Sequence, residues 1–488
     1  MNTLVWLQRD LRLADHAPLV HALQRSDKVV IAYIHDPSLI LGEANAVWLG
    51  HSLRQLQNQI QQKGGDLLLI EGAFSQAFEQ LVQTYQINQV FYHYEVGQVF
   101  QQQQTAALKA CQTARIPLTP YDQAWCSPES VLSQKGGLYS VFTPFYKKLL
   151  TLMNQVALPM AEPQELNQCK LDQASPLPAS LIHLMNQPWA KAMIAHWQQS
   201  ESSNLAIGEL AAWSRFQTFV EQALNDYPED RDLPAVHGTS RLSVHLQFGE
   251  ISMRQLLYYT QGYKTDPDVN NHALDMFIRQ LAWREFGRYL LHFHPQLEQQ
   301  PFQAKFAKFP WDDTPEFVSK WQEGKTGFPI IDAAMRELWH TGFMHNRTRM
   351  LVASWLTKNA NQAWQVGQAW FANTLIDSDP ANNTMGWQWV AGCGVDAAPY
   401  YRLFNPLLQS EKFDPQARYI KHWLPELANL DEKACHAPWK HPKALAQAGI
   451  QLGRDYPEPC LSLEQSRADH LARVALQKSY TQALQLQN

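Results

Sequence analysis

The sequence contains few cysteines and no long apolar run. Its six cysteines are scattered over 488 residues without a Cys-x-x-Cys pair, so we expect neither a zinc nor an iron–sulfur site. Scattered thiols are typical of a reducing cytosol. No apolar run approaches the ~20 residues of a membrane span, and the N-terminus lacks the basic and apolar regions of an export signal. These absences predict a cytoplasmic protein without a bound metal.

The sequence also carries little charge. Charged residues make up 17% of the chain, and the formal net charge at pH 7 is -5. This acidic balance excludes a protein that binds polyanions through its overall charge, so a nucleic-acid partner would have to meet a local basic patch. The length is too great for one ordinary core, which predicts two or three domains.

The first 125 residues alternate between short apolar runs and longer helix-like stretches. The runs lie at residues 4–7, 29–34, 66–70 and 89–94. This alternation predicts an α/β domain with a doubly wound parallel sheet over residues 1–125. The Gly-x-Gly-x-x-Gly fingerprint of dinucleotide-binding sheets is absent after the first run, where the chain reads Gln8-Arg-Asp-Leu-Arg12. The main cofactor is therefore expected elsewhere.

Proline clusters and weak periodicity predict a connector over residues 126–204. From 205 to 480 the helical period dominates, which predicts a larger all-α domain. The clearest helical patterns in it cover residues 213–224, 276–292 and 330–358. Twelve of the 17 tryptophans follow residue 205. That bias exceeds what packing alone predicts, although a single tryptophan is far more often a core residue.

The stretch 377–406 mixes acids, amides and aromatic rings with little that is typical of core. Its polar and aromatic members include Asp377, Asp379, Asn382, Asn383, Trp387 and Trp389. The acids can accept hydrogen bonds from a ring edge or a sugar, and the amides can both donate and accept. On extended or turning backbone, Trp387 and Trp389 would point the same way. The mixture suits a flat, redox-active heteroaromatic ligand.

Residues 238–243, Gly-Thr-Ser-Arg-Leu-Ser, place three hydroxyl groups and an arginine within a few positions. Thr or Ser at a helix start leaves backbone N–H groups free to bind an anion. An ordinary helix N-cap is the equal alternative.

A second pattern predicts a polar stripe on the helix around residues 279–288. Gln280, Trp283, Arg284 and Arg288 fall on one face at helical spacing. A surface face linked by salt bridges is the plain interpretation. A base stacked on Trp283, with phosphates on the arginines, explains the mixture better.

Residues 341–350 give a third helical pattern. Asn346 and Met350 are one turn apart, and Arg347 and Arg349 lie between them. His345 is more often a packed histidine than a catalyst in such a setting.

These four segments, in their order along the chain, resemble motifs of the DNA photolyase/cryptochrome flavoprotein family. Residues 239–243 match its Thr-Ser-x-Leu-Ser motif, which holds the flavin diphosphate. Residues 344–350 match the Met-His-Asn-Arg-x-Arg-Met motif of the photolyases that act on cyclobutane pyrimidine dimers, so class I enzymes of that type are the nearest pattern. The resemblance implies light-driven repair of these dimers by electron transfer from photoexcited, reduced FAD to a dimer flipped out of DNA.

The resemblance also assigns residues. It implies that FAD is bound by Tyr227, Thr239, Ser240, Arg241, Leu242, Ser243, Phe277, Gln280, Arg284, Asn346, Arg349, Asp377, Asp379 and Asn383. It implies that DNA or the dimer is met by Arg231, Trp283, Arg347, Met350, Trp389, Arg402 and Gln409. Catalysis would involve Gln280 and Asn346 at the dimer, and Trp387, Trp364 and Trp311 as an electron relay from the surface. Arg349 is expected to pair with Asp377, and Asn383 to face flavin N5.

Two positions depart from the nearest pattern. Dimer photolyases usually have Glu at the position of Gln280. The (6-4) photolyases and animal cryptochromes have Gln there, like this chain. Folate-binding relatives have Asn-Glu where this chain has Gly97-Gln98, so a second antenna chromophore (folate, deazaflavin or FMN) stays open. The alternatives are a cryptochrome-type blue-light photoreceptor and a (6-4) photolyase. The end at Asn488, soon after the last helical pattern, favours an enzyme, which we expect to be a monomer that binds damaged DNA.

Overall fold

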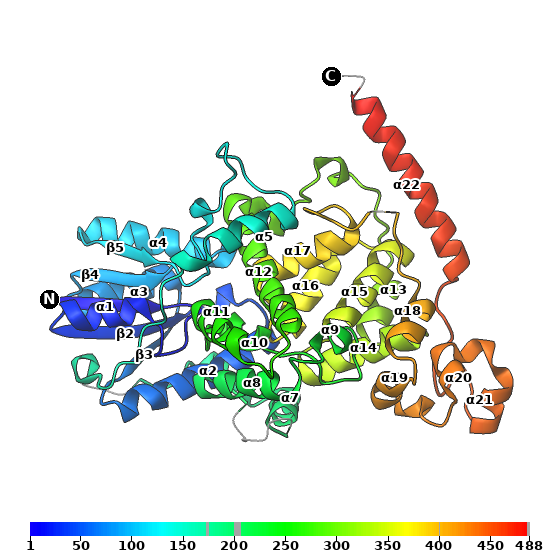
Figure 1. The fold of residues 1–488 in the computed structure, drawn as a ribbon, viewed down its shortest axis with the longest axis horizontal. Coiled ribbons are helices and arrows are strands. Elements are labelled where there is room, and N and C mark those ends of the chain that lie inside the picture. Colours follow the sequence, from blue (N-terminus) through cyan, green and yellow to red (C-terminus); the bar gives the residue numbers. More distant parts are fainter. Residues whose placement is uncertain (172–174, 200–205, 400, 486–488) are drawn as a thin grey trace. The chain divides into compact units, whose positions relative to one another are not determined.

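Five parallel strands form one sheet in the order β3-β2-β1-β4-β5. The computed structural model describes residues 1–171, 175–199, 206–399 and 401–485 (Figure 1). The strands are β1 (Asn2–Leu7), β2 (Lys28–His35), β3 (Leu67–Glu71), β4 (Gln89–His93) and β5 (Leu118–Tyr121). Leu4 pairs with Val30 on one side and with Val90 on the other. The order reverses between β1 and β4, which is where doubly wound sheets form a crevice beyond the strand ends.

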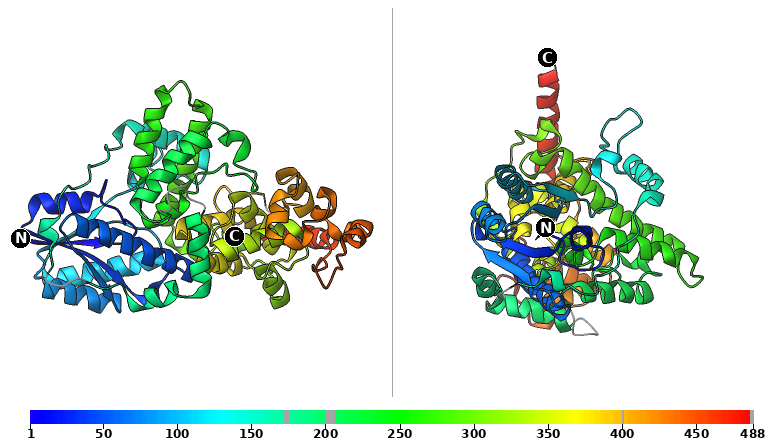
Figure 2. Two further views of the ribbon diagram at one scale, coloured as in Figure 1. Left: turned by 90° about the horizontal axis from the view of Figure 1, so that it is seen from below. Right: turned by 90° about the vertical axis from the view of Figure 1, so that its left-hand side faces the viewer.

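Four helices connect these strands, and they lie on both faces of the sheet (Figure 2). They are α1 (Ala17–Arg25), α2 (Glu43–Gln62), α3 (Phe74–Thr84) and α4 (Gln98–Ala114). The core on one side is formed by buried residues such as Trp6, Phe78 and Val90. The predicted α/β domain is therefore confirmed, and each predicted apolar run is a strand. Strand β5 was not predicted, because Pro120 interrupts its apolar pattern.

Contacts between Cα atoms divide the chain into two compact units whose segments alternate along the sequence. The first unit contains Met1–Asn225, Ser240–Pro295 and Ile376–Ala381, and the second contains Asp226–Thr239, Gln296–Leu375 and Asn382–Asn488. Spatial units that alternate along the chain do not test sequence boundaries, so the boundaries at 125/126 and 204/205 stay predictions.

Besides the sheet, the first unit contains a group of helices. They are α5 (Phe142–Thr151), α6 (Ala179–Met185), α7 (Pro188–Gln199), α8 (Glu209–Gln222), α10 (Ser243–Phe248), α11 (Met253–Gly262) and α12 (Asn271–Phe293). Asn270 caps α12, since its side chain accepts hydrogen bonds from the N–H groups of His272 and Ala273. This cap fixes the start of the 23-residue helix that carries the predicted polar stripe.

The second unit is helical. Its helices are α9 (Tyr227–Asp230), α13 (Pro315–Gln322), α14 (Pro329–Thr341), α15 (Asn346–Ser354), α16 (Trp364–Thr374), most of α17 (Pro380–Ala391), α18 (Pro406–Phe413), α19 (Arg418–Trp423), α20 (Glu432–His436), α21 (Pro442–Ala448) and α22 (Leu463–Gln485). A π-helical turn, Trp355–Asn359, follows α15. The core includes Trp321, Trp355 and Trp364. None of the described helices is long and apolar enough to cross a membrane.

Two local expectations were wrong. The helical pattern over 330–358 is broken, because Gly342 adopts a φ of +65° and ends α14, and His345 then caps α15 by accepting from Arg347 N–H. The stretch around Trp387 is helical rather than extended, as part of α17. Two residues apart on a helix, Trp387 and Trp389 point in nearly opposite directions, and only Trp387 is fully buried.

Candidate functional site

The polar stripe of α12 is half-buried, and its side chains differ in the contacts that they make. Gln280 makes one long hydrogen bond, 3.4 Å from Nε2 to the Met276 carbonyl of its own helix. Trp283 lies flat against Phe142, with ring centroids 3.6 Å apart and planes 7° from parallel. One face of Trp283 is therefore covered, so a stacked base can use only the other face.

Arg284 and Arg288 hold carboxylates of their own unit. Arg288 forms a 3.1 Å ion pair with Asp122, which explains its place without a phosphate. Arg284 donates to the Leu246 carbonyl at 3.2 Å and lies 3.5 Å from Asp379 Oδ2. Contact of either arginine with phosphate stays a prediction.

Asp379 joins α12 to the strand-end loop of the sheet. Arg9 donates to Asp379 Oδ2 at 2.5 Å, to Gln247 Oε1 at 2.8 Å and to Glu95, and its side chain is only 9% exposed. Burial lowers the pKa of Arg9, but the charges of Glu95 and Asp379 outweigh it and the net pKa is raised. Arg9 was not predicted as a site residue from the sequence. The available signal was a charged residue directly after a buried strand.

The segment 239–243 is a turn rather than the first turn of a helix. Arg241 adopts a φ of +51°, Leu242 N–H donates to Ser240 Oγ at 3.4 Å, and α10 begins only at Ser243. Within the second unit, Gly238 lies so close to α9 that an added Cβ would meet Asp230 Cβ at 2.5 Å. Hydroxyl groups and backbone N–H groups on such a turn are a donor set that fits a diphosphate.

Two further predicted flavin residues are placed by their neighbours. Tyr227 is buried beneath Arg231, whose guanidinium carbon is 5.2 Å from the ring centre. Phe277 packs against Phe219 with centroids 5.0 Å apart, in an aromatic cluster of the first unit. Both residues therefore have a clear packing role in the fold.

Asn383 on α17 has a fixed orientation, because its Nδ2 donates to the Gln368 carbonyl of α16 at 3.0 Å. One turn further, Trp387 is 2% exposed and packs edge-on against Phe371 and Trp321, with centroids 5.0 and 6.1 Å away. The amide N–H of Asn383 is thus used inside the protein, while its carbonyl oxygen keeps acceptor capacity.

The three tryptophans predicted as a relay lie in one hydrophobic cluster of the second unit. Trp387 and Trp364 are buried within it, and Trp311 packs against it while half-buried. Trp311 also contacts Phe309, with centroids 4.4 Å apart. The three residues thus share one region of the second unit, and their role as a relay stays a prediction.

Helix α15 presents Asn346, Arg347 and Met350 at or near the surface, whereas Arg349 is tied back. Arg349 Nε donates to the Met344 carbonyl at 2.7 Å, and its guanidinium lies 5.2 Å from the Phe343 ring. His345 is 5% exposed and serves as the N-cap, so it is a packed histidine.

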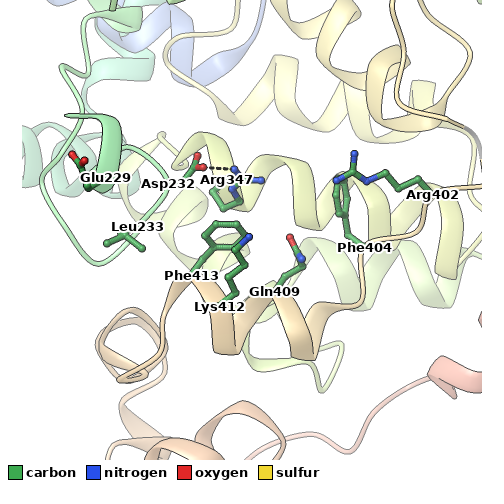
Figure 3. Close-up of a pocket in the computed structure, with 9 residues that line it drawn as sticks. All are labelled: Glu229, Asp232, Leu233, Arg347, Arg402, Phe404, Gln409, Lys412 and Phe413. Atoms are coloured by element: carbon green, nitrogen blue, oxygen red, sulfur yellow. Dashed lines mark ion pairs between the residues drawn. The ribbon is translucent and has the colours of Figure 1, made fainter. Parts of the chain in front are cut away.

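A pocket of about 450 Å³ lies beside α15 (Figure 3). We call it the arginine pocket. Its lining residues are Glu229, Asp232, Leu233, Arg347, Arg402, Phe404, Gln409, Lys412 and Phe413. It brings together three of the predicted DNA residues, Arg347, Arg402 and Gln409. Asp232 was not predicted, and its carboxylate is 2.5 Å from Arg347.

A buried lysine holds the segment that carries Arg402. Lys358, on the π-helical turn, is fully buried and donates from Nζ to the Arg402 carbonyl at 2.7 Å. Burial lowers the pKa of Lys358 to about 7. π-Helical turns often occur at functional sites, and this one could not be recognised from the sequence.

A second, narrow pocket of about 50 Å³ lies at the carboxyl ends of β1 and β2, where Gln8, Tyr33, Asn45 and Phe100 are among its lining residues. Both polar side-chain atoms of Gln8 are buried without a hydrogen-bond partner among the described residues. Polar groups are thus present for a second chromophore, but the volume is far below the ~300 Å³ of an ordinary ligand site. The choice between folate, deazaflavin, FMN and no antenna stays open.

One cluster in the described residues has the composition of a metal site. Asp10, His16 and His93 place one ligand atom each within 4.8 Å of one another, and all three are buried. Asp10 Oδ2 lies 3.0 Å from His16 Nε2 and 2.8 Å from His93 Nδ1, while Oδ1 accepts from Gln8 N–H. These hydrogen bonds satisfy the aspartate as a structural group.

Comparison with known proteins identifies the family of the chain. Residues 3–164 match the model described as DNA photolyase, and residues 277–476 match the FAD binding domain of DNA photolyase. A deoxyribodipyrimidine photo-lyase of Agrobacterium fabrum is 35% identical over 98% of both chains. The chain belongs to the DNA photolyase/cryptochrome family, and its helical domain is a flavin-binding one.

Two solved structures show which members it is similar to. A bacterial class III photolyase from Agrobacterium tumefaciens superposes with a TM-score of 0.90, at 34% identity and 98% coverage of both chains. The Synechocystis cryptochrome has a TM-score of 0.87 at 30% identity, covering 97% of this chain and 99% of its own. The class within the family is therefore open between repair enzyme and photoreceptor.

Proposed function

We propose that the protein is a deoxyribodipyrimidine photo-lyase that uses light to split cyclobutane pyrimidine dimers in DNA. The observation that supports this proposal is the arginine pocket, whose lining includes Arg347, Arg402 and Gln409. Asn346, the residue before Arg347, is exposed. Phosphate contacts from such arginines position DNA locally, as the acidic net charge requires. FAD, when bound and reduced, supplies the electron that light excites for dimer cleavage.

Each unit contains hydrogen-bonding groups that are suited to binding part of FAD. The turn formed by Thr239, Ser240, Arg241, Leu242 and Ser243 offers hydroxyl and N–H groups for the diphosphate. Asn383, held by the Gln368 carbonyl, directs its remaining acceptor to the ring system. In the first unit, Asp379 is shared by Arg9 and Arg284, and with Asp377 it would orient the polar edge of the flavin. In the second unit, Arg349 is the corresponding candidate.

For contacts with the flipped dimer, the first unit offers Gln280 and Trp283, and the second unit offers Asn346 and Met350. The free face of Trp283 stacks on one base, since Phe142 holds the opposite face. Trp389 is the second aromatic wall, and Arg231 joins the backbone contacts. Gln280 donates a hydrogen bond without being able to transfer a proton.

A second candidate is a cryptochrome-type photoreceptor or a (6-4) photolyase. Gln280 favours it, because the sequence pattern of those proteins has an amide here. The similarity to the Synechocystis cryptochrome also points in this direction. Asn346 and Met350 favour dimer repair.

One experiment separates these functions. Purified protein is reduced, illuminated and given DNA with either a cyclobutane dimer or a (6-4) photoproduct. We expect repair of the first substrate alone, and FAD as the cofactor released on denaturation. Repair of neither substrate would favour the photoreceptor. Protein that cannot be reconstituted with FAD would exclude the photolyase and the photoreceptor functions alike.

The relay is tested separately. Trp387→Phe is expected to block photoreduction of oxidised enzyme while leaving repair by chemically reduced enzyme mostly intact. Loss of both activities would make Trp387 a structural residue. We also propose that the enzyme acts as a monomer in the cytoplasm, which size-exclusion chromatography with light scattering and cell fractionation can test.

A further inference from the structure

The arginine pocket contains acidic residues where a phosphate-binding surface should have none. Glu229 and Asp232 face the pocket together with Arg347, Arg402 and Lys412 (Figure 3). A carboxylate in contact with phosphate is repulsive, so these acids need an explanation that phosphate binding alone does not give.

Asp232 forms an ion pair with Arg347, the arginine that the proposed function assigns to DNA. Its Oδ2 lies 2.5 Å from Arg347 Nη2, and the side chains of Asp232 and Arg347 are 36% and 17% exposed. The Arg347 guanidinium carbon also lies 4.2 Å over the Phe413 ring. The ion pair is therefore formed in the free protein, at a place that solvent and a ligand can reach.

The remaining donors of Arg347 are weakly used. Arg347 Nη1 has only a 3.9 Å contact with Met350 Sδ. Arg347 Nε has no hydrogen-bond partner among the described residues. A phosphate group could accept two parallel hydrogen bonds from Arg347, whereas Asp232 makes a single contact with it in the free protein. The arginine is thus neutralised but not satisfied.

We propose that Asp232 is a specificity-determining residue: its carboxylate neutralises Arg347 until a phosphodiester of dimer-containing DNA replaces it. This inference rests on the proposed function. A straight, undamaged backbone meets no uncompensated charge from Arg347. A backbone that enters the pocket next to a flipped dimer brings its phosphate close enough to displace the carboxylate.

The physical consequence has a definite sign. Removing the negative charge leaves Arg347 as a free cation, which attracts any DNA backbone and releases about one more counterion on binding. Affinity for undamaged DNA rises, while affinity for damaged DNA changes less because Asp232 is already displaced there. The ratio of the two affinities falls.

The opposite prediction follows if Asp232 only anchors Arg347 against Phe413. Losing the anchor would then loosen the guanidinium, and affinity for damaged DNA would fall. The two roles therefore differ in the direction of the change.

The test measures Kd in the dark for matched duplexes with and without one cyclobutane dimer, over a series of salt concentrations. Asp232→Asn keeps the shape and removes the charge. We expect it to bind undamaged DNA about two- to fivefold more tightly, with a salt slope steeper by about 0.9.

Glu229→Gln is the matched control, because it removes the same charge from the same pocket without belonging to the Arg347 ion pair. Its effect on the affinity ratio should be smaller. In an Arg347→Gln background, Asp232→Asn should no longer change binding of undamaged DNA. Equal effects of the two acidic substitutions, or weaker binding of both duplexes by Asp232→Asn, would overturn the inference.

Thermal unfolding shows whether each variant is folded, and Asp232→Ser replaces Asp232→Asn if the latter is not. Failure of the proposed function has a different signature, since the wild-type protein would then neither prefer nor repair the damaged duplex. If the wild type repairs the dimer but neither Asp232 variant changes the affinity ratio, the inference about Asp232 is wrong and the proposed function stands.

Discussion

Arg9 in the first unit and Arg347 in the second both bind carboxylates, yet their surroundings differ. Arg9 is enclosed by Glu95, Asp379 and Gln247, and its side chain is 9% exposed. Arg347 has one carboxylate, and its partner Asp232 is 36% exposed. An enclosed pair cannot be exchanged for a ligand without leaving buried charge, whereas a half-exposed pair can. The first arrangement is therefore structural, and the second is suited to binding.

The largest effect is expected for Arg9→Met. The substitution leaves the carboxylates of Glu95 and Asp379 buried without their cation, which should lower the free energy of unfolding by about 3–5 kcal/mol. Urea denaturation measures this change. Arg25→Met, at the exposed end of α1, is the control and should change stability by less than ~0.5 kcal/mol. A loss below ~1 kcal/mol for Arg9→Met would mean that its pairs are no more structural than surface ones.

Arg347→Ala should act on binding rather than on stability. Loss of a charge-assisted contact to phosphate should weaken binding of damaged DNA about tenfold and flatten its salt slope by about 1. Titrations over a salt series provide both numbers. Arg418→Ala removes an exposed arginine of α19 that does not line the pocket, and it should change neither. Unchanged salt dependence in Arg347→Ala would remove Arg347 from the DNA contacts.

Lys358 should make stability depend on pH. Its pKa in the folded protein is about 7, compared with ~10.4 in an unfolded chain. Between these values the unfolded state binds more protons, so its contribution to stability rises with pH by at most ~1.4 kcal/mol per pH unit. Below pH 7 both states are protonated, and this pH dependence ends.

Urea denaturation at pH 6, 7.5 and 9 should therefore show a rise in the wild type that Lys358→Met lacks. Lys433→Met, an exposed lysine on α20, should keep the wild-type profile. Parallel pH profiles for the wild type and Lys358→Met would show that Lys358 is charged in the fold.

The smallest effect is expected for Gln280→Glu. A neutral hydrogen bond contributes only ~0.5–1.5 kcal/mol, so dimer affinity should stay within a few-fold. A protonated carboxyl group would better stabilise charge developing on the dimer, which should raise the repair yield per absorbed photon. Gln280→Asn, with a shorter amide, is the control. If Gln280→Glu loses dimer repair, the substrate assignment is wrong.

The fold class could be predicted because periodicity reports burial directly. The strands near Leu4, Val30 and Val90 are apolar runs, and the helical second half follows its own period. The break at Gly342 was missed, since apolar residues on both sides keep the helical phase. The helix around Trp387 was missed because its polar and aromatic residues show no clear period.

The site could be predicted only where residue types recur in a known order. Arg347 and Asn383 were identified in this way, and their roles stay predictions. Arg9 and Asp379, 370 positions apart, meet only in the fold. The burial of Lys358 and its contact with the Arg402 carbonyl depend on a π-helical turn that no pattern in the sequence indicates.

The place of Trp387 is determined partly by an absent side chain. Gly367 on α16 leaves so little room that an added Cβ would lie 2.0 Å from Trp387 Cη2. Helix propensity alone favours alanine over glycine by roughly 1 kcal/mol, so a search for stabilising substitutions would choose Gly367→Ala first. Such a change would push the indole away from its present position without altering its chemistry. If Trp387 carries electrons as proposed, its position depends on the missing side chain of Gly367 on α16 as much as on the indole of α17.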